Sequence, residues 1–202
     1  MAGMTEVHRE FEFPLREIAL MLAKGAVVGL ATDTTYALVA ALSSKKGVER
    51  LREMRRVAPS KPLSILMKDL AEISRFAYVD RIGYRLMKRL TPGPFTFILR
   101  ATKEVPRMTL TKQRTVGVRV PDVPIVTAIL DALGEPLISG SAVVWDVGYA
   151  EDPDQILKCY AELDLLLDAG HKSSETSTVI DLTGTTPEIV RMGSAEPDLT
   201  IV

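Results

Sequence analysis

The chain of 202 residues has few of the residues that build disulfides and structural zinc sites. Its one cysteine, Cys159, excludes an intrachain disulfide, and its two histidines, His8 and His171, stand in no spacing typical of zinc ligands. A chain of this length buries about 70% of its unfolded surface and needs neither kind of cross-link. We therefore expect no structural metal, and the missing disulfide framework fits a reducing compartment, here the cytoplasm.

Long apolar runs are also missing. No segment approaches the ~18 consecutive apolar residues of a membrane span, which argues against a membrane partner. Residues 1–13 carry Glu6, Glu10 and Glu12 and no apolar segment before a small-residue cleavage site, so we expect no signal peptide. Aromatic residues make up only 5% of the chain, which disfavours nucleic-acid binding dominated by base stacking.

Several common catalytic motifs are absent as well. The sequence has no P-loop and no GxGxxG segment after a strand. His8 lies near a terminus that we expect to be mobile, which leaves only His171 for a Ser/His/Asp set. Ordinary hydrolases and dehydrogenases are therefore disfavoured.

The charges that are present are unevenly distributed. The whole chain has 25 Lys+Arg and 26 Asp+Glu, but residues 45–119 hold 19 of these cations and only 6 of the carboxylates. Clustered cations raise the local potential, which predicts an anionic partner for this segment. The alternative, left open by charge alone, is that basic helices face acidic ones or water.

The hydrophobic pattern alternates between short helices and short strands. Helices are predicted at 14–24, 43–54, after Asp69, at 81–90, 125–133 and 153–162, and strands at 26–31, 62–67, 95–99, 116–120, 137–142, 163–167, 178–182 and 188–191. Gly184 and Thr185 predict a hairpin between the last two strands. We expect a single α/β domain over residues 1–202 (core about 13–193), with helices around an open mixed sheet. No separate C-terminal domain is expected, and the apolar runs are explained by the core, so no obligate protein partner is inferred.

Hydroxyls and arginines follow or end many of these strands. They are Thr32, Thr34, Thr115, Arg119, Ser139, Ser141, Ser177, Thr178 and Arg191. Ligands of open α/β sheets bind beyond the carboxyl ends of the strands, where such groups can hold phosphate, ribose or carboxylate oxygens. Singly, each hydroxyl also fits a turn cap and each arginine a solvated surface position. These residues alone indicate an α/β domain that binds a small anionic or nucleotide-like ligand.

At these segments the sequence resembles the YrdC/YciO family of threonylcarbamoyl-AMP synthases. The matching pieces are 32–36, 61–63, 91–96, 115–121, 136–142, 177–181 and Arg191, in family order and over nearly the whole chain. Segments at 85–88, 96–107 and 132–136 are closest to the YciO branch. The resemblance implies a twisted α/β sheet with a concave, positively charged cleft. It also implies condensation of L-threonine, bicarbonate and ATP with release of pyrophosphate, for the threonylcarbamoyladenosine modification of tRNA.

The resemblance also assigns roles to individual residues. Positions that hold L-threonine fall on Thr34, Arg119, Ser139 and Ser177, with Arg119 pairing with the substrate carboxylate. Positions that hold the nucleotide fall on Thr32, Thr115, Ser141 and Arg191. Arg55 and Lys61 are the candidate catalytic cations, and ATP with Mg²⁺ would be the substrate and its cofactor.

Three positions depart from the family pattern. An expected arginine falls on Val57, an expected asparagine on Val143 and an expected histidine on Leu66. A hydrogen bond to a charged group is worth ~1.5–3 kcal/mol, so each lost phosphate contact would slow the reaction about tenfold to a hundredfold. Lys61 could compensate in part for the missing arginine.

Two functions therefore remain. The first is a nucleotide- and RNA-binding protein, for tRNA or double-stranded RNA, whose synthase site is partly degenerate. Its candidate RNA contacts are Arg52, Arg55, Arg56, Lys61, Arg85, Lys88 and Arg89. The second is an active synthase that uses Lys61 or Arg56 in place of the missing arginine. A different adenylate-forming or nucleotide-hydrolysing reaction is a third possibility, but no residue argues for it.

Overall fold

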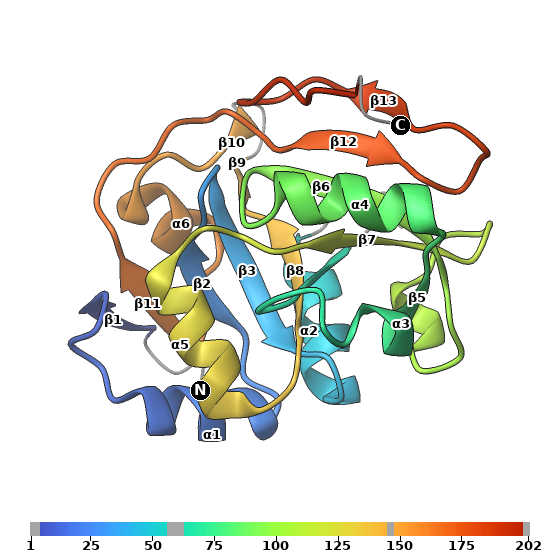
Figure 1. Cartoon of the computed structure of the whole chain (residues 1–202). Helices are drawn as coiled ribbons and strands as arrows, with labels where there is room; N and C mark the ends of the chain where they lie inside the picture. The colour runs from blue at the N-terminus through green and yellow to red at the C-terminus, as the bar shows by residue number, and fades with distance from the viewer. Residues whose placement is uncertain (1–4, 56–62, 145–147, 200–202) are drawn as a thin grey trace.

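A single mixed sheet of eleven strands forms the centre of the computed structural model, which describes residues 5–55, 63–144 and 148–199. Its strands are β1 (Glu6–Arg9), β2 (Val28–Ala31), β3 (Tyr36–Ala41), β4 (Ser64–Leu66), β5 (Ala77–Tyr78), β6 (Phe95–Ala101), β7 (Thr115–Arg119), β8 (Leu137–Ser141), β11 (Leu165–Asp168), β12 (Thr178–Asp181) and β13 (Glu188–Arg191). The order is β1-β11-β2-β3-β8-β4-β7-β6-β12-β13, and β5 pairs with β6 (Figure 1). Strands β9 (Val143–Val144) and β10 (Gly148–Tyr149) form a separate small antiparallel pair.

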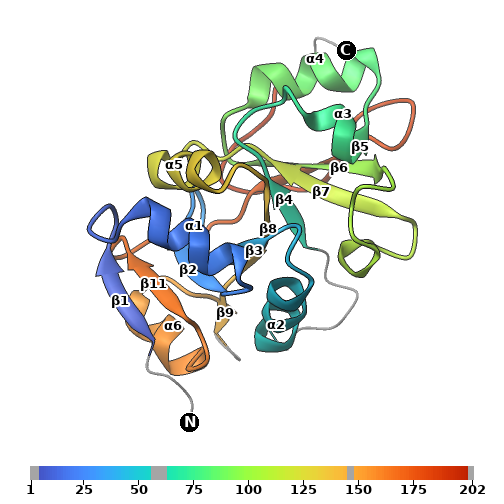
Figure 2. The same cartoon turned by 90° about the horizontal axis from the view of Figure 1, so that it is seen from below.

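Helices cover the two faces of this sheet through two apolar clusters. One cluster joins the sheet to α2 (Lys45–Arg55), α3 (Ile73–Phe76), α4 (Arg81–Leu90) and α6 (Pro153–Cys159). The other joins it to α1 (Leu15–Ala23) and α5 (Pro124–Leu133). Figure 2 shows α1 and α5 together on one side of β2 and β3, with α2 and α6 on the other. None of the described helices therefore covers the part of the second face over β6, β7 and β12.

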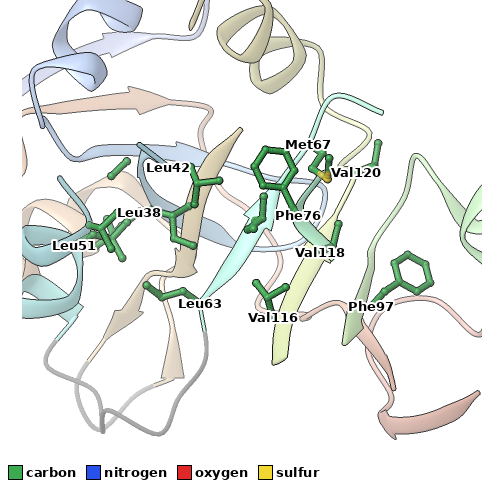
Figure 3. Close-up of a cluster of buried hydrophobic side chains, with 14 of the residues drawn as sticks. Leu38, Leu42, Leu51, Leu63, Met67, Phe76, Phe97, Val116, Val118 and Val120 are labelled. Atoms are coloured by element: carbon green, nitrogen blue, oxygen red, sulfur yellow. The ribbon is translucent and has the colours of Figure 1, made fainter. Parts of the chain in front are cut away.

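Strand β7 shows how this open face arises from the sequence. Successive side chains of a strand point to opposite faces. Val116 and Val118 are buried in the cluster drawn in Figure 3, together with Phe97 of β6. Thr115, Gly117 and Arg119 consequently face the other way and line a cavity. The polar half of the alternation thus builds the candidate site.

The mixed α/β architecture predicted from the sequence is confirmed, including the antiparallel pair β12–β13. Strands β1, β3, β5, β9 and β10 were not predicted. Strand β3 is buried along its whole length, so its sequence does not alternate between apolar and polar residues. His8 lies in β1, which pairs with β11, instead of in a mobile end.

The prediction that Asp69 caps a short helix is wrong. Its carboxylate accepts a hydrogen bond from the Ala71 amide, whereas α3 begins at Ile73. Asp69 therefore caps a turn before the helix. Among the described residues, no helix is both long enough and apolar enough to span a membrane.

Candidate functional site

A cavity of about 270 Å³ opens where the sheet lacks a helix. Seven residues singled out from the sequence line it: Arg55, Thr115, Arg119, Ser139, Ser141, Ser177 and Arg191. They come from α2, β7, β8, the residue before β12, and β13, so the fold joins segments that are far apart in the chain. Because the sheet is mixed, the lining includes both first and last residues of strands. Arg119, Ser141 and Arg191 end their strands, whereas Thr115 begins β7.

Arg119, the last residue of β7, is a buried cation that pairs with one carboxylate among the described residues. Its side chain is 8% exposed, and its Nη2 lies 2.6 Å from Oδ1 of Asp33. Nη2 also donates to Thr34 Oγ1 at 3.1 Å, whereas Nε is buried without a hydrogen-bond partner in the described structure. Burial lowers the pKa of Arg119, and the charge of Arg191 lowers it further, while Asp33 opposes both effects. Arg119 thus lines the cavity with a guanidinium that retains one donor, Nε, without a partner among the described residues.

The turn of residues 32–35 positions the Arg119 side chain through Asp33 and Thr34. Thr32 Oγ1 donates to the Thr35 carbonyl at 2.8 Å and lies 2.9 Å from Thr34 Oγ1. Asp33 Oδ2 also accepts from the Asp122 amide at 3.2 Å, which ties the turn to the segment after β7. Thr32 and Thr34 are both buried and are not part of the cavity lining. The structure therefore places the two threonines outside the cavity lining, where they would influence a ligand only through Arg119.

Arg55 approaches the cavity from the carboxyl end of α2. It is 5% exposed, and its Nε donates to the Ser141 carbonyl at 3.3 Å. No carboxylate forms an ion pair with it among the described residues. Burial lowers its pKa, and Arg52 adds a repulsive charge. A buried, unpaired guanidinium beside a cavity is suited to an anionic ligand.

Two pairs of hydrogen-bonded hydroxyl groups form another part of the cavity lining. Ser177 Oγ lies 2.7 Å from Thr96 Oγ1, and Arg191 Nη2 donates to the Ser177 carbonyl at 2.8 Å. Thr115 Oγ1 lies 2.7 Å from Thr111 Oγ1. Each hydroxyl pair can still provide one hydrogen-bond donor or acceptor to a ligand, because a hydroxyl both donates and accepts.

Several lining residues carried no role in the sequence argument. They are Ser64, Thr96, Ile98, Thr111, Val116, Gly117, Gly140, Tyr149 and Val179. Gly117 has no side chain to fill this part of the cavity, where a Cβ would lie 2.8 Å from Ser64 Oγ. Alternation along the strands could have signalled Ser64 and Thr96, whereas Asp33, the partner of Arg119, is revealed only by tertiary structure.

The family to which the chain belongs follows from comparison with known proteins. The model of the Sua5/YciO/YrdC family, whose description reads telomere recombination, matches residues 20–193. The chain belongs to this family. YciO of Escherichia coli, described as uncharacterized, is 40% identical over 176 residues, which cover 86% of this chain and 85% of that protein. The mouse threonylcarbamoyl-AMP synthase is 29% identical over 175 residues, 83% of this chain and 62% of that protein.

Solved structures of the Sua5/YciO/YrdC family agree with this assignment. The crystal structure of E. coli YciO has a TM-score of 0.85 at 36% identity, with 97% of this chain and 98% of that chain covered. Sua5 of P. abyssi in complex with L-threonine has a TM-score of 0.83 at 26% identity, covering 94% of this chain and 57% of that chain. The chain thus spans well under two thirds of that Sua5.

The positions that depart from the family pattern lie in different surroundings. Val143 lines the cavity, and its backbone amide and carbonyl are both hydrogen-bonded to the Tyr160 hydroxyl at 2.8 Å. Position 143 therefore offers the cavity an aliphatic side chain and no unpaired backbone group. Leu66 is fully buried in the cluster under α1 and α5. Val57 lies outside the described residues.

Of the candidate RNA contacts that the structure describes, only Arg55 lines the cavity. Arg85, Lys88 and Arg89 are exposed on α4, and Arg89 pairs with Asp198 at 3.1 Å. Arg52 is half-buried on α2, beside Arg55. Arg56 and Lys61 lie outside the described residues. In the described part of the chain, no cluster of three or more His, Cys, Asp or Glu side chains is arranged to hold a metal ion.

Proposed function

We propose that this protein binds an adenine nucleotide together with L-threonine or a closely similar amino acid in the described cavity. The observation that carries the proposal is the charge of the lining. Arg55, Arg119 and Arg191 meet there, and the carboxylate of Asp33 forms an ion pair with only one of them. This excess of positive charge suits a ligand with several negative charges, such as a nucleoside triphosphate. Relatives named as threonylcarbamoyl-AMP synthases, and one solved with L-threonine, support the choice of ligands.

The two ligands would use different parts of the lining. The amino-acid carboxylate would accept from the guanidinium of Arg119, while Ser139 and Ser177 bind its polar groups. The phosphates would lie near Arg55 and Arg191, because these guanidinium groups have no carboxylate partner in the described structure. Thr115 and Ser141 would hold the remaining nucleotide oxygens.

Synthesis of threonylcarbamoyl-AMP would be slow in this protein. In that reaction a carbamate oxygen attacks the α-phosphorus and pyrophosphate leaves, so charge that builds up on the phosphates must be stabilised. Val143 places no amide at the cavity wall, and its own backbone groups are occupied by Tyr160. We therefore propose a site that retains ligand binding and has lost part of its catalytic power.

Calorimetric titration with ATP, with L-threonine and with both tests binding, and release of pyrophosphate in the presence of bicarbonate and Mg²⁺ tests the reaction. Binding of both ligands with weak, threonine-dependent pyrophosphate release is expected. No binding of either ligand would contradict the proposal. Rapid release would instead favour the alternative of a fully active synthase.

A single substitution tests the explanation for the slow reaction. Val143→Asn restores an amide to the wall and is expected to raise the rate up to about tenfold to a hundredfold, the worth of one hydrogen bond to a charged group. Val144→Asn is the matched control, because Val144 is the next residue and does not line the cavity. If Val143→Asn is as slow as the parent, the double variant with Val57→Arg shows whether the second lost position limits the rate.

RNA binding is the second candidate function, and the exposed cations of α4 support it. Arg81, Arg85 and Lys88 follow one another at spacings of four and three residues, so they share a face of the helix. Adjacent cations on that face lie about 5–6 Å apart and can contact successive phosphates of a nucleic-acid backbone. All three are exposed, and none forms an ion pair with a described residue.

The salt dependence of RNA affinity tests this second function. Binding of a double-stranded RNA or a tRNA should weaken steeply with salt, by about −0.9 in logarithmic slope for each phosphate neutralised on a duplex. Arg85→Ala with Lys88→Ala should flatten that slope by about two, whereas Arg16→Ala on α1 should leave it unchanged. Affinity that does not change with salt would rule out this mode of binding.

A further inference from the structure

Arg55 reaches the cavity by passing over the backbone of Gly140. Helix α2 packs on β3 and β8, and Arg55 is its last residue. A Cβ built on Gly140 would lie 2.5 Å from both Cζ and Nε of Arg55 and 2.7 Å from its Cδ. Real Cβ contacts are not this short, so the observed path of Arg55 requires a glycine at this position.

The two partners in this contact differ in their freedom to move. Gly140 lies inside β8, where it pairs with Leu38 of β3, so its backbone is fixed by the sheet. The Arg55 guanidinium is the far end of a flexible side chain, and among the described residues its Nε donates only to the Ser141 carbonyl, at 3.3 Å. A side chain at position 140 would therefore displace the guanidinium, and the strand would keep its place.

We propose that Gly140 is a positioning residue that keeps the Arg55 guanidinium in the cavity, where it contacts the phosphates of the nucleotide. The ligand part of this inference rests on the proposed function. Position 140 has no side chain because the Arg55 guanidinium occupies that space. The guanidinium has no carboxylate partner among the described residues because the ligand supplies the opposite charge. Gly140 thus determines whether the site can hold a highly charged anion, although it contributes no polar side chain itself.

A double-mutant cycle tests the proposal, with calorimetric titration of ATP on the whole chain. Arg55→Ala should weaken ATP binding about tenfold or more, because a charge-assisted contact is lost. Gly140→Ala should weaken it by a comparable factor, and the double variant should bind no worse than Arg55→Ala alone. Gly184→Ala is the matched control, since a Cβ there has no neighbour closer than 3.7 Å, and it should bind like the wild type.

A ligand-free measurement separates this inference from the proposed function. In a crystal structure of Gly140→Ala the guanidinium should have moved away from the Ser141 carbonyl while β8 is unchanged. A guanidinium in its original place overturns the inference, and so do losses for the two single variants that simply add in the double variant. Failure of the wild type to bind ATP would overturn the proposed function, and the crystal structure of Gly140→Ala would still decide the positioning role. Where Gly140→Ala fails to fold, normal folding of the double variant would confirm that the clash is with Arg55, and failure of both would overturn the inference.

Discussion

Tyr36 shows how a single residue couples stability to pH. It is fully buried, its hydroxyl donates to the Gly170 carbonyl at 2.8 Å, and it accepts from the Ala169 amide at 2.9 Å. Burial raises the pKa of Tyr36 from 10.0 to about 12. The unfolded chain therefore loses this proton first, and the stability that Tyr36 contributes is full below pH 10 and is lost as the pH rises towards 12.

We predict that Tyr36→Phe lowers the free energy of unfolding at pH 7 by about 1–3 kcal/mol, because two backbone groups lose their partner. The variant should also lose less stability than the wild type between pH 10 and pH 12. Urea denaturation at several pH values measures both effects. Tyr84→Phe, an exposed position on α4, is the control and should change neither. Equal alkaline losses in the wild type and Tyr36→Phe would contradict the prediction.

Individual residues of the site could be predicted only as far as their chemistry is local. Arg119 and Ser139 lie in strands and Ser177 directly precedes one, and the structure brings all three to the cavity. That Arg119 is bound to Asp33, 86 residues away, could not be predicted, because the pairing depends on sheet order. The role of Gly140 was equally hidden, since it arises from the path of a side chain on another element.

At the scale of elements, the turn between β2 and β3 acts as a rigid support for the site. The carboxylate of Asp33 in this turn pairs with Arg119, and both side chains are more than nine-tenths buried. We predict that Asp33→Ala costs about 3–5 kcal/mol of stability, because removal of one partner leaves an uncompensated buried charge. It should also weaken threonine binding, since Arg119 is no longer fixed.

Thermal or urea denaturation measures the first effect, and calorimetry with L-threonine measures the second. Asp33→Asn is the informative companion variant. It keeps an acceptor for Arg119 Nη2 but removes the charge, so it should fall between the wild type and Asp33→Ala. A wild-type stability for Asp33→Ala would mean that the ion pair does not support the site.

Elements with a clear period were predictable, and those whose sequence lacks one were not. Helix α5 begins with Pro124 and ends before Gly134, which has φ +74°. Both ends of this helix could therefore be predicted from the sequence. Strand β3 has no alternation because both of its faces are buried, by α1 on one side and α2 on the other. Helix α6 ends at Cys159, three residues earlier than its pattern predicted.

For the molecule as a whole, the candidate site arises because helices cover the sheet only in part. Two helices, α1 and α5, cover one end of the second face, and much of the cavity lining comes from the uncovered part of that face, with Arg55 added from α2. The first face is closed by an extended apolar cluster that contains residues of α2, α3, α4 and α6. The cavity lining is mostly polar and lies largely outside the two apolar clusters, although Val116 belongs to both the lining and the first cluster.

This separation predicts how ligands stabilise the whole molecule. A ligand at a hundred times its Kd raises the free energy of unfolding by about 2.7 kcal/mol, and each kcal/mol raises Tm by about 2–4 °C in a domain of this size. If ATP and L-threonine occupy separate parts of the cavity, saturating amounts of both should raise Tm more than either alone. Two ligands that compete for one position would give no added shift.

Thr115→Val distinguishes the two parts of the cavity within the same measurement. The substitution keeps the shape of the side chain and removes the hydroxyl that lies 2.7 Å from Thr111 Oγ1. It should reduce the Tm shift caused by ATP and preserve the shift caused by L-threonine, because Thr115 belongs to the nucleotide part of the proposed site. An equal loss of both shifts would indicate that the cavity behaves as one undivided pocket, and the assignment of separate amino-acid and nucleotide positions would have to be abandoned.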